Sequence, residues 1–334
     1  MSYRKDQNHL SHNPYIMKES DLDRYTRLLQ RLRVDHNKNR YTTGKAPHKA
    51  TLLLSLIILS ANKRQDLANI KIDLDLKETW VELWKCLDYE KPGPIHLPLY
   101  HLISSDFWNI DLKEGISPHP PSSLDQLQKM VLKISMKDDL IGYIADESSR
   151  DKIISSILNG GYYSEDEKKR LIEKIEVLNG SFIYESEMIQ AVKKEFTLEA
   201  RAENINQLPL RDSAFRRMIL GTYKETCAIC GMQVQTTTGI SVIDAAHILP
   251  FNKFHNDDIR NGIALCKIHH WLFDRGLISV DDHYRVIVSK SIEMEYPDNI
   301  ITGFHKLDIR LPQKPDHYPH PVAIKWHRTN VFER

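Results

Sequence analysis

Four residues with metal-binding side chains stand in two short motifs of matching spacing. Cys227 and Cys230 lie in the stretch CAICG, and Cys266 and His269 lie in the stretch LCKIHH. Two residues separate the members of each pair, and Gly231 permits a tight turn after the first pair. Zinc prefers four thiolate or imidazole ligands in a tetrahedron. The two motifs therefore predict one structural zinc (Zn²⁺) site.

The cysteines also allow two other interpretations. A Cys-x-x-Cys pair can be a redox site, although no βαβ pattern surrounds this one. The cysteines can instead be reduced and buried beside an unrelated histidine. Four cysteines in 334 residues do not indicate a disulfide scaffold.

Two further histidines and an asparagine lie between and beside these motifs. His247 ends the β-like run ISVIDAAHI, Asn261 follows fourteen residues later, and His270 follows nine residues after that. A neutral imidazole can accept a proton from water near neutral pH, and it can also bind a metal ion. Neighbouring side chains on a helix point about 100° apart. His269 can therefore face the zinc while His270 points in another direction.

These stretches resemble the HNH endonucleases, whose core is a β-hairpin and a helix that hold one catalytic metal. The resemblance is carried by CAIC, DAAHILPF and RNGIALCKIHHWLFDRGLISV, and it covers about residues 211–290. The variants AAHI and HHWLFDRG are similar to those of the subgroup found in bacterial restriction enzymes. The resemblance implies that the chain is a phosphodiester hydrolase that acts on DNA.

The resemblance also implies a role for each matched residue. His247 would be the general base that activates water against a phosphodiester. Asn261 would orient that histidine or hold the loop that carries it. His270 would bind the catalytic divalent ion, Mg²⁺ or Mn²⁺. Such an ion neutralises charge on the scissile phosphate and stabilises the leaving oxygen.

One position departs from the family pattern. Many HNH proteins carry an acidic metal ligand directly before the general base, where this chain has Ala246. Asp244 has the same strand parity as Ala246 and so points to the same face. We assign Asp244 to the catalytic metal. The alternative is that it fixes a backbone turn or a neighbouring basic residue.

The N-terminal half carries a second resemblance, over about residues 20–165. The stretches YTTGKAPHKATLLLSLI and GPIHLPLYHLISSDFWNI resemble the sulfur-binding domain of restriction enzymes that attack phosphorothioate-modified DNA. Sulfur in place of a phosphate oxygen is larger, more polarisable and less hydrated, so a shallow apolar pocket with a basic rim can accept it. The resemblance places Pro98 in that pocket, but Leu97 stands where the family commonly has tyrosine.

Five other side chains are candidates to contact DNA or support the pocket: Arg40, His48, Lys49, Tyr100 and His101. Each can instead be a solvated loop residue or a core contact, and His48 and Lys49 also begin a long apolar helix. Residues 1–60 contain eleven Lys or Arg against five Asp or Glu. This excess attracts phosphates, or it is a solvated helix face.

Periodicity predicts a mainly helical N-terminal half. The predicted helices span residues 20–34, 48–63, 76–87, 148–158 and 164–178, and a later helix begins near residue 210 and runs into the first Cys motif. Residues 90–110 contain three prolines and a glycine, followed by a β-like aromatic run.

We therefore predict an α+β protein with two domains, which 334 residues can accommodate. Residues 1–165 would form a mainly helical domain that reads modified DNA, and residues 166–205 a helical connector. Residues 206–334 would form a zinc-stapled ββα-metal (HNH) nuclease domain.

The predicted location is cytoplasmic, with no membrane partner. The longest apolar run, Ala50 to Ala61, has 12 residues and is too short to span a bilayer. The first ten residues lack the apolar stretch of a signal peptide. A net charge of +1 does not make the whole chain a polyanion binder.

The combined prediction is an endonuclease that restricts modified, phosphorothioated double-stranded DNA. One alternative keeps the nuclease but has the first domain read methylated or unmodified DNA. Another is a non-cleaving, zinc-containing DNA-binding protein, against which His247, Asn261 and His270 argue. Cutting both strands with one site per chain would require a homodimer or two successive nicks, and both alternatives stay open.

Overall fold

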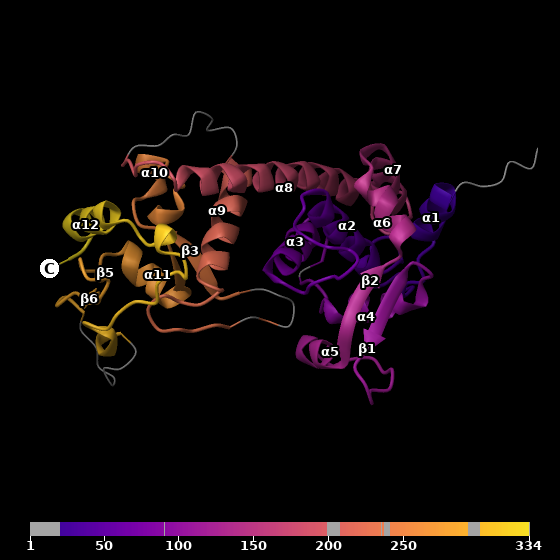
Figure 1. Cartoon of the computed structure of the whole chain (residues 1–334), viewed down its shortest axis with the longest axis horizontal. Coiled ribbons are helices and arrows are strands. Elements are labelled where there is room, and N and C mark those ends of the chain that lie inside the picture. The colour runs from indigo at the N-terminus through magenta and orange to yellow at the C-terminus, as the bar shows by residue number, and fades with distance from the viewer. Residues whose placement is uncertain are drawn as a thin grey trace, which may run out of the picture.

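Two groups of elements lie at opposite ends of the long helix α8 (Glu165–Ala191), as Figure 1 shows. The computed structural model describes residues 21–89, 91–198, 208–234, 236, 241–292 and 301–333. Buried apolar side chains form one core in each group. Within these described ranges, no helix combines the length and apolar character needed to cross a membrane.

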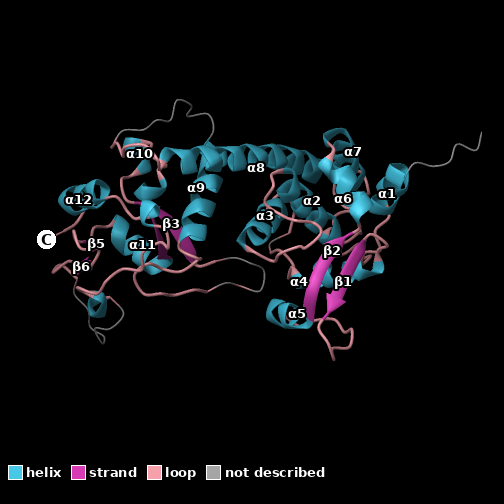
Figure 2. Ribbon diagram, viewed as in Figure 1, coloured by secondary structure: helices cyan, strands magenta, loops and turns pink. Residues whose placement is uncertain are grey.

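The N-terminal group is mainly helical and contains one small sheet (Figure 2). Its helices are α1 (Asp21–Gln30), α2 (His48–Ala61), α3 (Leu74–Trp84), α4 (His96–His101), η1 (Leu102–Ser104), α5 (Leu124–Met130), α6 (Asp138–Ala145) and α7 (Glu147–Leu158). The sheet pairs β1 (Trp108–Leu112) with β2 (Val131–Met136) in antiparallel register, and Trp108 lies opposite Met136. The helices predicted from periodicity are confirmed, whereas α5, α6 and β2 were not predicted.

The β-like expectation for the segment after the Pro/Gly loop is only half right. The strand β1 begins at Trp108, and residues 96–101 form the short helix α4. Pro98 is tolerated there because it lies in the first turn, where a backbone N–H has no partner within the helix.

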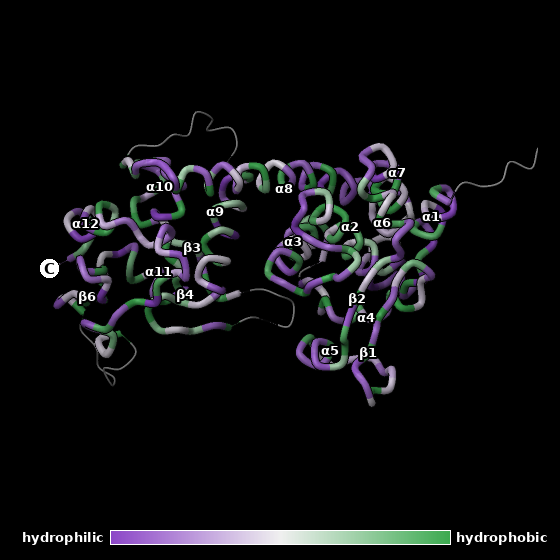
Figure 3. The backbone as a smooth tube through the Cα atoms, in the orientation of Figure 1, coloured by the Kyte–Doolittle hydropathy of each residue, from purple (hydrophilic) through white to green (hydrophobic). Residues whose placement is uncertain are grey.

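Helix α2 is the centre of the first core. Every residue from Lys49 through Leu59 is buried, so the helix is apolar on nearly all sides, as its hydropathy in Figure 3 indicates. A helix without a polar face must be surrounded by other elements. Helices α3, α4, α6, α7 and α8 pack against it and enclose it.

Helix α8 contributes to both cores. A capping box between Ser164 and Glu167 fixes its start. Leu178 and Phe182 pack in the first core and Met188 in the second, and Figure 3 shows hydrophobic and hydrophilic segments alternating along it. The helix lies in the predicted connector, whose residues 199–205 fall outside the described ranges. The domain boundaries themselves stay a prediction.

The C-terminal group contains a β-hairpin followed directly by a helix. It begins with α9 (Leu208–Thr222), and the antiparallel strands β3 (Ile243–His247) and β4 (Gly262–Cys266) then lead into α11 (Lys267–Asp274). A second hairpin pairs β5 (Ile278–Val280) with β6 (Val286–Val288). The remaining elements are α10 (Phe251–Phe254), η3 (Ile259–Asn261), η4 (Thr302–Phe304), η5 (Pro315–His317) and α12 (Pro321–Asn330). Mixed helices and small sheets confirm the coarse α+β prediction.

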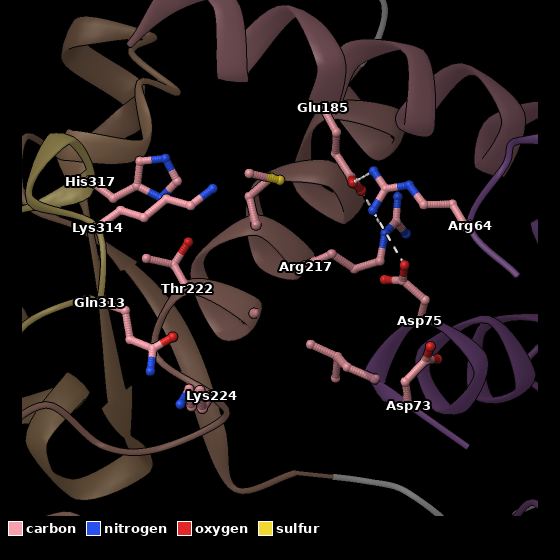
Figure 4. Close-up of a pocket in the computed structure, with 13 residues that line it drawn as sticks. Arg64, Asp73, Asp75, Glu185, Arg217, Thr222, Lys224, Gln313, Lys314 and His317 are labelled. Carbon is pink, nitrogen blue, oxygen red and sulfur yellow. Dashed lines mark hydrogen bonds and ion pairs between the residues drawn. The ribbon is translucent and has the colours of Figure 1, made fainter. Parts of the chain in front are cut away.

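A buried ion network joins the two groups (Figure 4). Glu185 of α8 is fully buried and pairs with Arg64 of the N-terminal group and with Arg217 of α9, 2.6 Å away. Arg64 also contacts Asp75 at 3.3 Å. The network borders a pocket of about 400 Å³ lined by both groups. Because an unpaired buried charge is costly, loss of one partner of Glu185 should destabilise this junction.

Candidate active site and zinc centre

The four predicted zinc ligands converge in the C-terminal group. Cys227, Cys230, Cys266 and His269 present ligand atoms that all lie within 4.8 Å of one another. The Sγ atoms of Cys230 and Cys266 are 4.0 Å apart, and Nδ1 of His269 lies 3.1 Å from Sγ of Cys266. A tetrahedral zinc bound about 2.3 Å from each sulfur separates two sulfurs by roughly 3.8 Å. The donor set and its spacing therefore fit zinc.

Local structure explains how two distant segments meet at this cluster. Cys227 and Cys230 lie in the turn after α9, and Gly231 closes that turn at φ +73°. A side chain at Gly231 would collide with the guanidinium of Arg310, 2.4 Å from the position of its Cβ. Hydrogen bonds from Cys266 and His269 outweigh burial and hold the pKa of the Cys227 thiol well below its usual range. A thiolate at that position is the form that binds metal.

His247 lies at the end of β3 in a partly apolar pocket. Its ring stacks on Phe215, with the ring centroids 3.7 Å apart and the planes within 4°, and Phe251 lies 5.3 Å away. The side chain is 19% exposed, and its Nε2 atom is 3.0 Å from a carboxylate oxygen of Asp257. Sequence reasoning did not identify Asp257, because no motif spacing links it to His247.

Asn261 is fully buried beside the strand pair. Its side-chain oxygen accepts a hydrogen bond from the backbone N–H of Leu249 at 2.8 Å, and its amide donates to the carbonyl of Asn256 at 2.8 Å. These bonds close the loop that follows His247. Of the two roles considered for Asn261, holding this loop is the one that these contacts favour.

Asp244 and His270 face each other across β3 and α11. Oδ2 of Asp244 is 3.5 Å from Nδ1 of His270, and Nε2 of His270 is 3.4 Å from Asp274. Asp244 also binds Arg216 at 3.0 Å and the ammonium of Lys267. Both interpretations of Asp244 thus have a geometric basis: it lies beside the predicted metal-binding histidine, and it fixes two basic side chains.

Electrostatics at this pair follow from the same contacts. Burial favours the neutral carboxyl of Asp244, but hydrogen bonds from His270 and Lys267 outweigh it and hold its pKa below the usual range. The hydrogen bond to Asp244 correspondingly raises the pKa of His270. A carboxylate and an imidazole in this arrangement could hold a divalent ion, and Asp274 is a further oxygen donor that sequence reasoning missed.

The predicted DNA-reading residues converge on a pocket of about 620 Å³ in the N-terminal group. Five of the six line it: Arg40, His48, Lys49, Pro98 and His101. The sixth, Tyr100, is buried beside the pocket with its ring edge-on to His101. Arg33, Leu97 and Ser104 also line the pocket and were not predicted to bind DNA. Arg33 belongs to the N-terminal excess of basic residues, which was the only signal for it.

Burial changes the charges of this pocket. It lowers the pKa of Lys49 to about 8, with the Arg33 charge adding to the effect, and Nζ of Lys49 donates to the Ser104 hydroxyl at 3.2 Å. Burial also lowers the pKa of His48 to about 4, so this imidazole is neutral near pH 7. Its ring packs 4.8 Å from that of Trp84. His48 therefore offers the pocket a neutral polar surface, whereas the basic charge comes from its neighbours.

Comparison with known proteins identifies part of this site. Residues 227–281 match the family model of the HNH endonucleases, and this segment contains the Cys/His cluster, His247, Asn261 and His270. No curated protein matches the chain. A solved structure of a modification-dependent TagI restriction endonuclease is 23% identical with a TM-score of 0.29, and the alignment covers 35% of this chain and 37% of that one. The chain thus carries an HNH endonuclease domain, which implies metal-dependent nuclease activity at the level of the family.

We expect the Cys/His cluster to be a folding element. Elemental analysis should find about one zinc ion per chain. Cys227→Ala and Cys266→Ala should each unfold the C-terminal group, because structural zinc supplies on the order of 10 kcal/mol of folding free energy. Cys86→Ala is the matched control, since this fourth cysteine is buried in the N-terminal core. Folded, active protein without zinc would contradict the prediction.

We expect His247→Ala to reduce DNA cleavage by about 10²–10⁴-fold, because a general base typically contributes that much to the rate. DNA affinity and zinc content should be unchanged. His283→Ala, at an exposed histidine in the turn between β5 and β6, should cleave like the parent. Cleavage by His247→Ala at the parent rate, measured with Mg²⁺ or Mn²⁺, would rule out this assignment.

Proposed function

We propose that this protein is an endonuclease that recognises phosphorothioated double-stranded DNA and hydrolyses a phosphodiester at its HNH domain. The observation that carries the proposal is the N-terminal pocket. Residues selected for a sulfur site from the sequence alone, among them Pro98, Lys49 and Arg40, line one pocket there. Sulfur recognition combines an apolar contact with charge at its edge, and this pocket offers both.

The apolar surface comes from α4 and the loop before it. Pro94, Leu97 and Pro98 line the pocket, and the prolines have no backbone N–H to satisfy. A non-bridging sulfur is weakly hydrated, so transferring it to this surface costs less than transferring a phosphate oxygen. Leu97, which replaces the tyrosine common in the family, keeps this side of the pocket apolar.

The basic groups come from the segment before α2 and from α2 itself. Arg33, Arg40 and Lys49 line it and would contact the phosphate that carries the sulfur, or its neighbours. Such contacts fix the position on DNA and depend on salt, whereas the sulfur contact supplies the selectivity. His48 and His101 would add neutral hydrogen-bonding groups, since burial lowers the pKa of both.

At the HNH domain, His247 would accept a proton from the attacking water. Asp244 and His270 would hold Mg²⁺ or Mn²⁺, which supplies charge neutralisation at the phosphate and the leaving oxygen. The Cys/His cluster would hold zinc in a structural role. His269 and His270 are neighbours on α11, so one short helix would connect the zinc centre to the reaction centre.

The proposal predicts a sulfur-dependent affinity. Full-length His247→Ala should bind a duplex with one phosphorothioate at least about tenfold more tightly than the matched plain duplex. Adding Pro98→Asp should remove this preference and leave weak, salt-sensitive binding, while Arg40→Ala should weaken binding to both duplexes. Pro118→Asp, in an exposed loop, makes the same charge change away from the pocket and should keep the preference. An affinity ratio near one across several sequences would instead favour a reader of methylated DNA.

The low pKa of Lys49 predicts a pH-dependent affinity. Lys49 is protonated below its pKa of about 8 and neutral above it, against a usual value of 10.5. A bound phosphate favours the charged form, so affinity should fall about tenfold as the pH rises from roughly 7 to 9. Lys49→Arg keeps the charge throughout this range and should make the affinity independent of pH. A parent protein whose affinity stays constant over the same range would contradict the prediction.

A further inference from the structure

A buried carboxylate contacts the proposed general base. Asp257 lies in the loop between α10 and η3, and its side chain is only 4% exposed. One oxygen, Oδ1, lies 3.0 Å from Nε2 of His247. This distance is that of a hydrogen bond between an imidazole N–H and a carboxylate.

The other oxygen of Asp257 is held by two side chains from different helices. Arg211 of α9, 2% exposed, places Nη2 at 2.7 Å and Nε at 2.9 Å from Oδ2. The hydroxyl of Tyr184 on α8 donates to the same oxygen at 3.1 Å. The guanidinium of Arg211 also lies over the ring of Phe251, 4.6 Å from its centroid. These contacts fix the carboxylate from the side opposite His247.

The contacts of the two Asp257 oxygens indicate which nitrogen of His247 carries the proton. Arg211 and Tyr184 occupy Oδ2, which leaves Oδ1 directed at His247. A carboxylate paired with arginine is ionised and can only accept hydrogen bonds. Nε2 of His247 must therefore carry a proton, and Nδ1 keeps its lone pair when the ring is neutral. Stacking on Phe215 fixes the ring plane, and the contact with Asp257 then fixes the rotation within that plane.

We propose that Asp257 is a positioning residue for His247, with Arg211 and Tyr184 as its supports. It selects the tautomer in which Nδ1 is the basic atom, and it fixes the direction in which Nδ1 points. When Nδ1 takes the proton of the attacking water, the Asp257 carboxylate stabilises the imidazolium that forms. This inference rests on the proposed role of His247 as the general base.

The direct test is the tautomer of His247 in Asp257→Asn. Nitrogen NMR of the full chain with isotope-labelled histidine distinguishes the two tautomers, and His247→Gln identifies the resonances of His247. In the parent protein Nε2 should carry the proton. The asparagine amide can donate as well as accept, so the variant should shift His247 towards the Nδ1–H form. An unchanged tautomer in Asp257→Asn would overturn the proposal.

Cleavage kinetics supply the second readout. Asp257→Asn should lower kcat by on the order of 10²–10⁴-fold, as for other histidines that lose an orienting partner, and should leave KM nearly unchanged. Asp257→Glu, which restores an acceptor, should recover part of kcat. A kcat equal to that of the parent would overturn the proposal. If the parent protein cleaves no DNA, the proposed function fails, while the tautomer measurement still decides the role of Asp257.

Two further variants separate a loss of stability in Asp257→Asn from a loss of the orientation of His247. Glu185→Gln removes a buried carboxylate from another ion network on α8, so it should reduce stability without changing the tautomer of His247. Asp257→Asn combined with Arg211→Met removes both buried charges and keeps the variant testable where the single change fails to fold. Without Arg211 the asparagine amide can face either way, so the readout of the double variant is kcat, which should fall as it does in Asp257→Asn because the carboxylate that stabilises the imidazolium is gone. A kcat equal to that of the parent would contradict the proposal.

Discussion

The Cys/His cluster ties together the segments that carry the C-terminal site. It joins the turn after α9, through Cys227 and Cys230, to the junction of β4 and α11, through Cys266 and His269. Two five-residue strands and an eight-residue helix bury little apolar surface by themselves. An ion held by all four side chains would add folding free energy and fix these segments relative to one another. Since His270 directly follows His269, a displacement of α11 from the cluster would also displace His270 from Asp244.

In the N-terminal pocket, burial reduces the positive charge of the side chains that line it. The surroundings that make the Pro98 side apolar also lower the pKa of Lys49 to about 8 and that of His48 to about 4. A strongly hydrated phosphate oxygen is matched poorly by such partners. A less hydrated anion loses less hydration free energy when it enters the same pocket. Its negative charge also favours the protonated form of Lys49. Under the proposed function, desolvation would thus favour the phosphorothioate over the ordinary phosphate without any clash.

Local features of the sequence were predictable, and contacts between distant segments were not. The zinc motifs and the helices around α2 follow from spacing and periodicity, and the five pocket residues follow from family resemblance. Pro98 lies in a helix because a proline in a first turn costs little, which a β-like composition obscures. Asp257, Arg211 and Tyr184 belong to three separate elements, and no periodic signal connects them. Their meeting at His247 is decided by tertiary packing alone.

Helix α8 takes part in two of these distant contacts. Tyr184 and Glu185 are adjacent on this helix, so their side chains point about 100° apart. Glu185 pairs with Arg64 of the N-terminal group and Arg217 of α9, while Tyr184 reaches Asp257 beside His247. One turn of α8 therefore takes part both in the junction between the groups and in the support of the proposed base. Tyr184 of α8 and Arg211 of α9 thus support Asp257, in addition to the hairpin that carries His247.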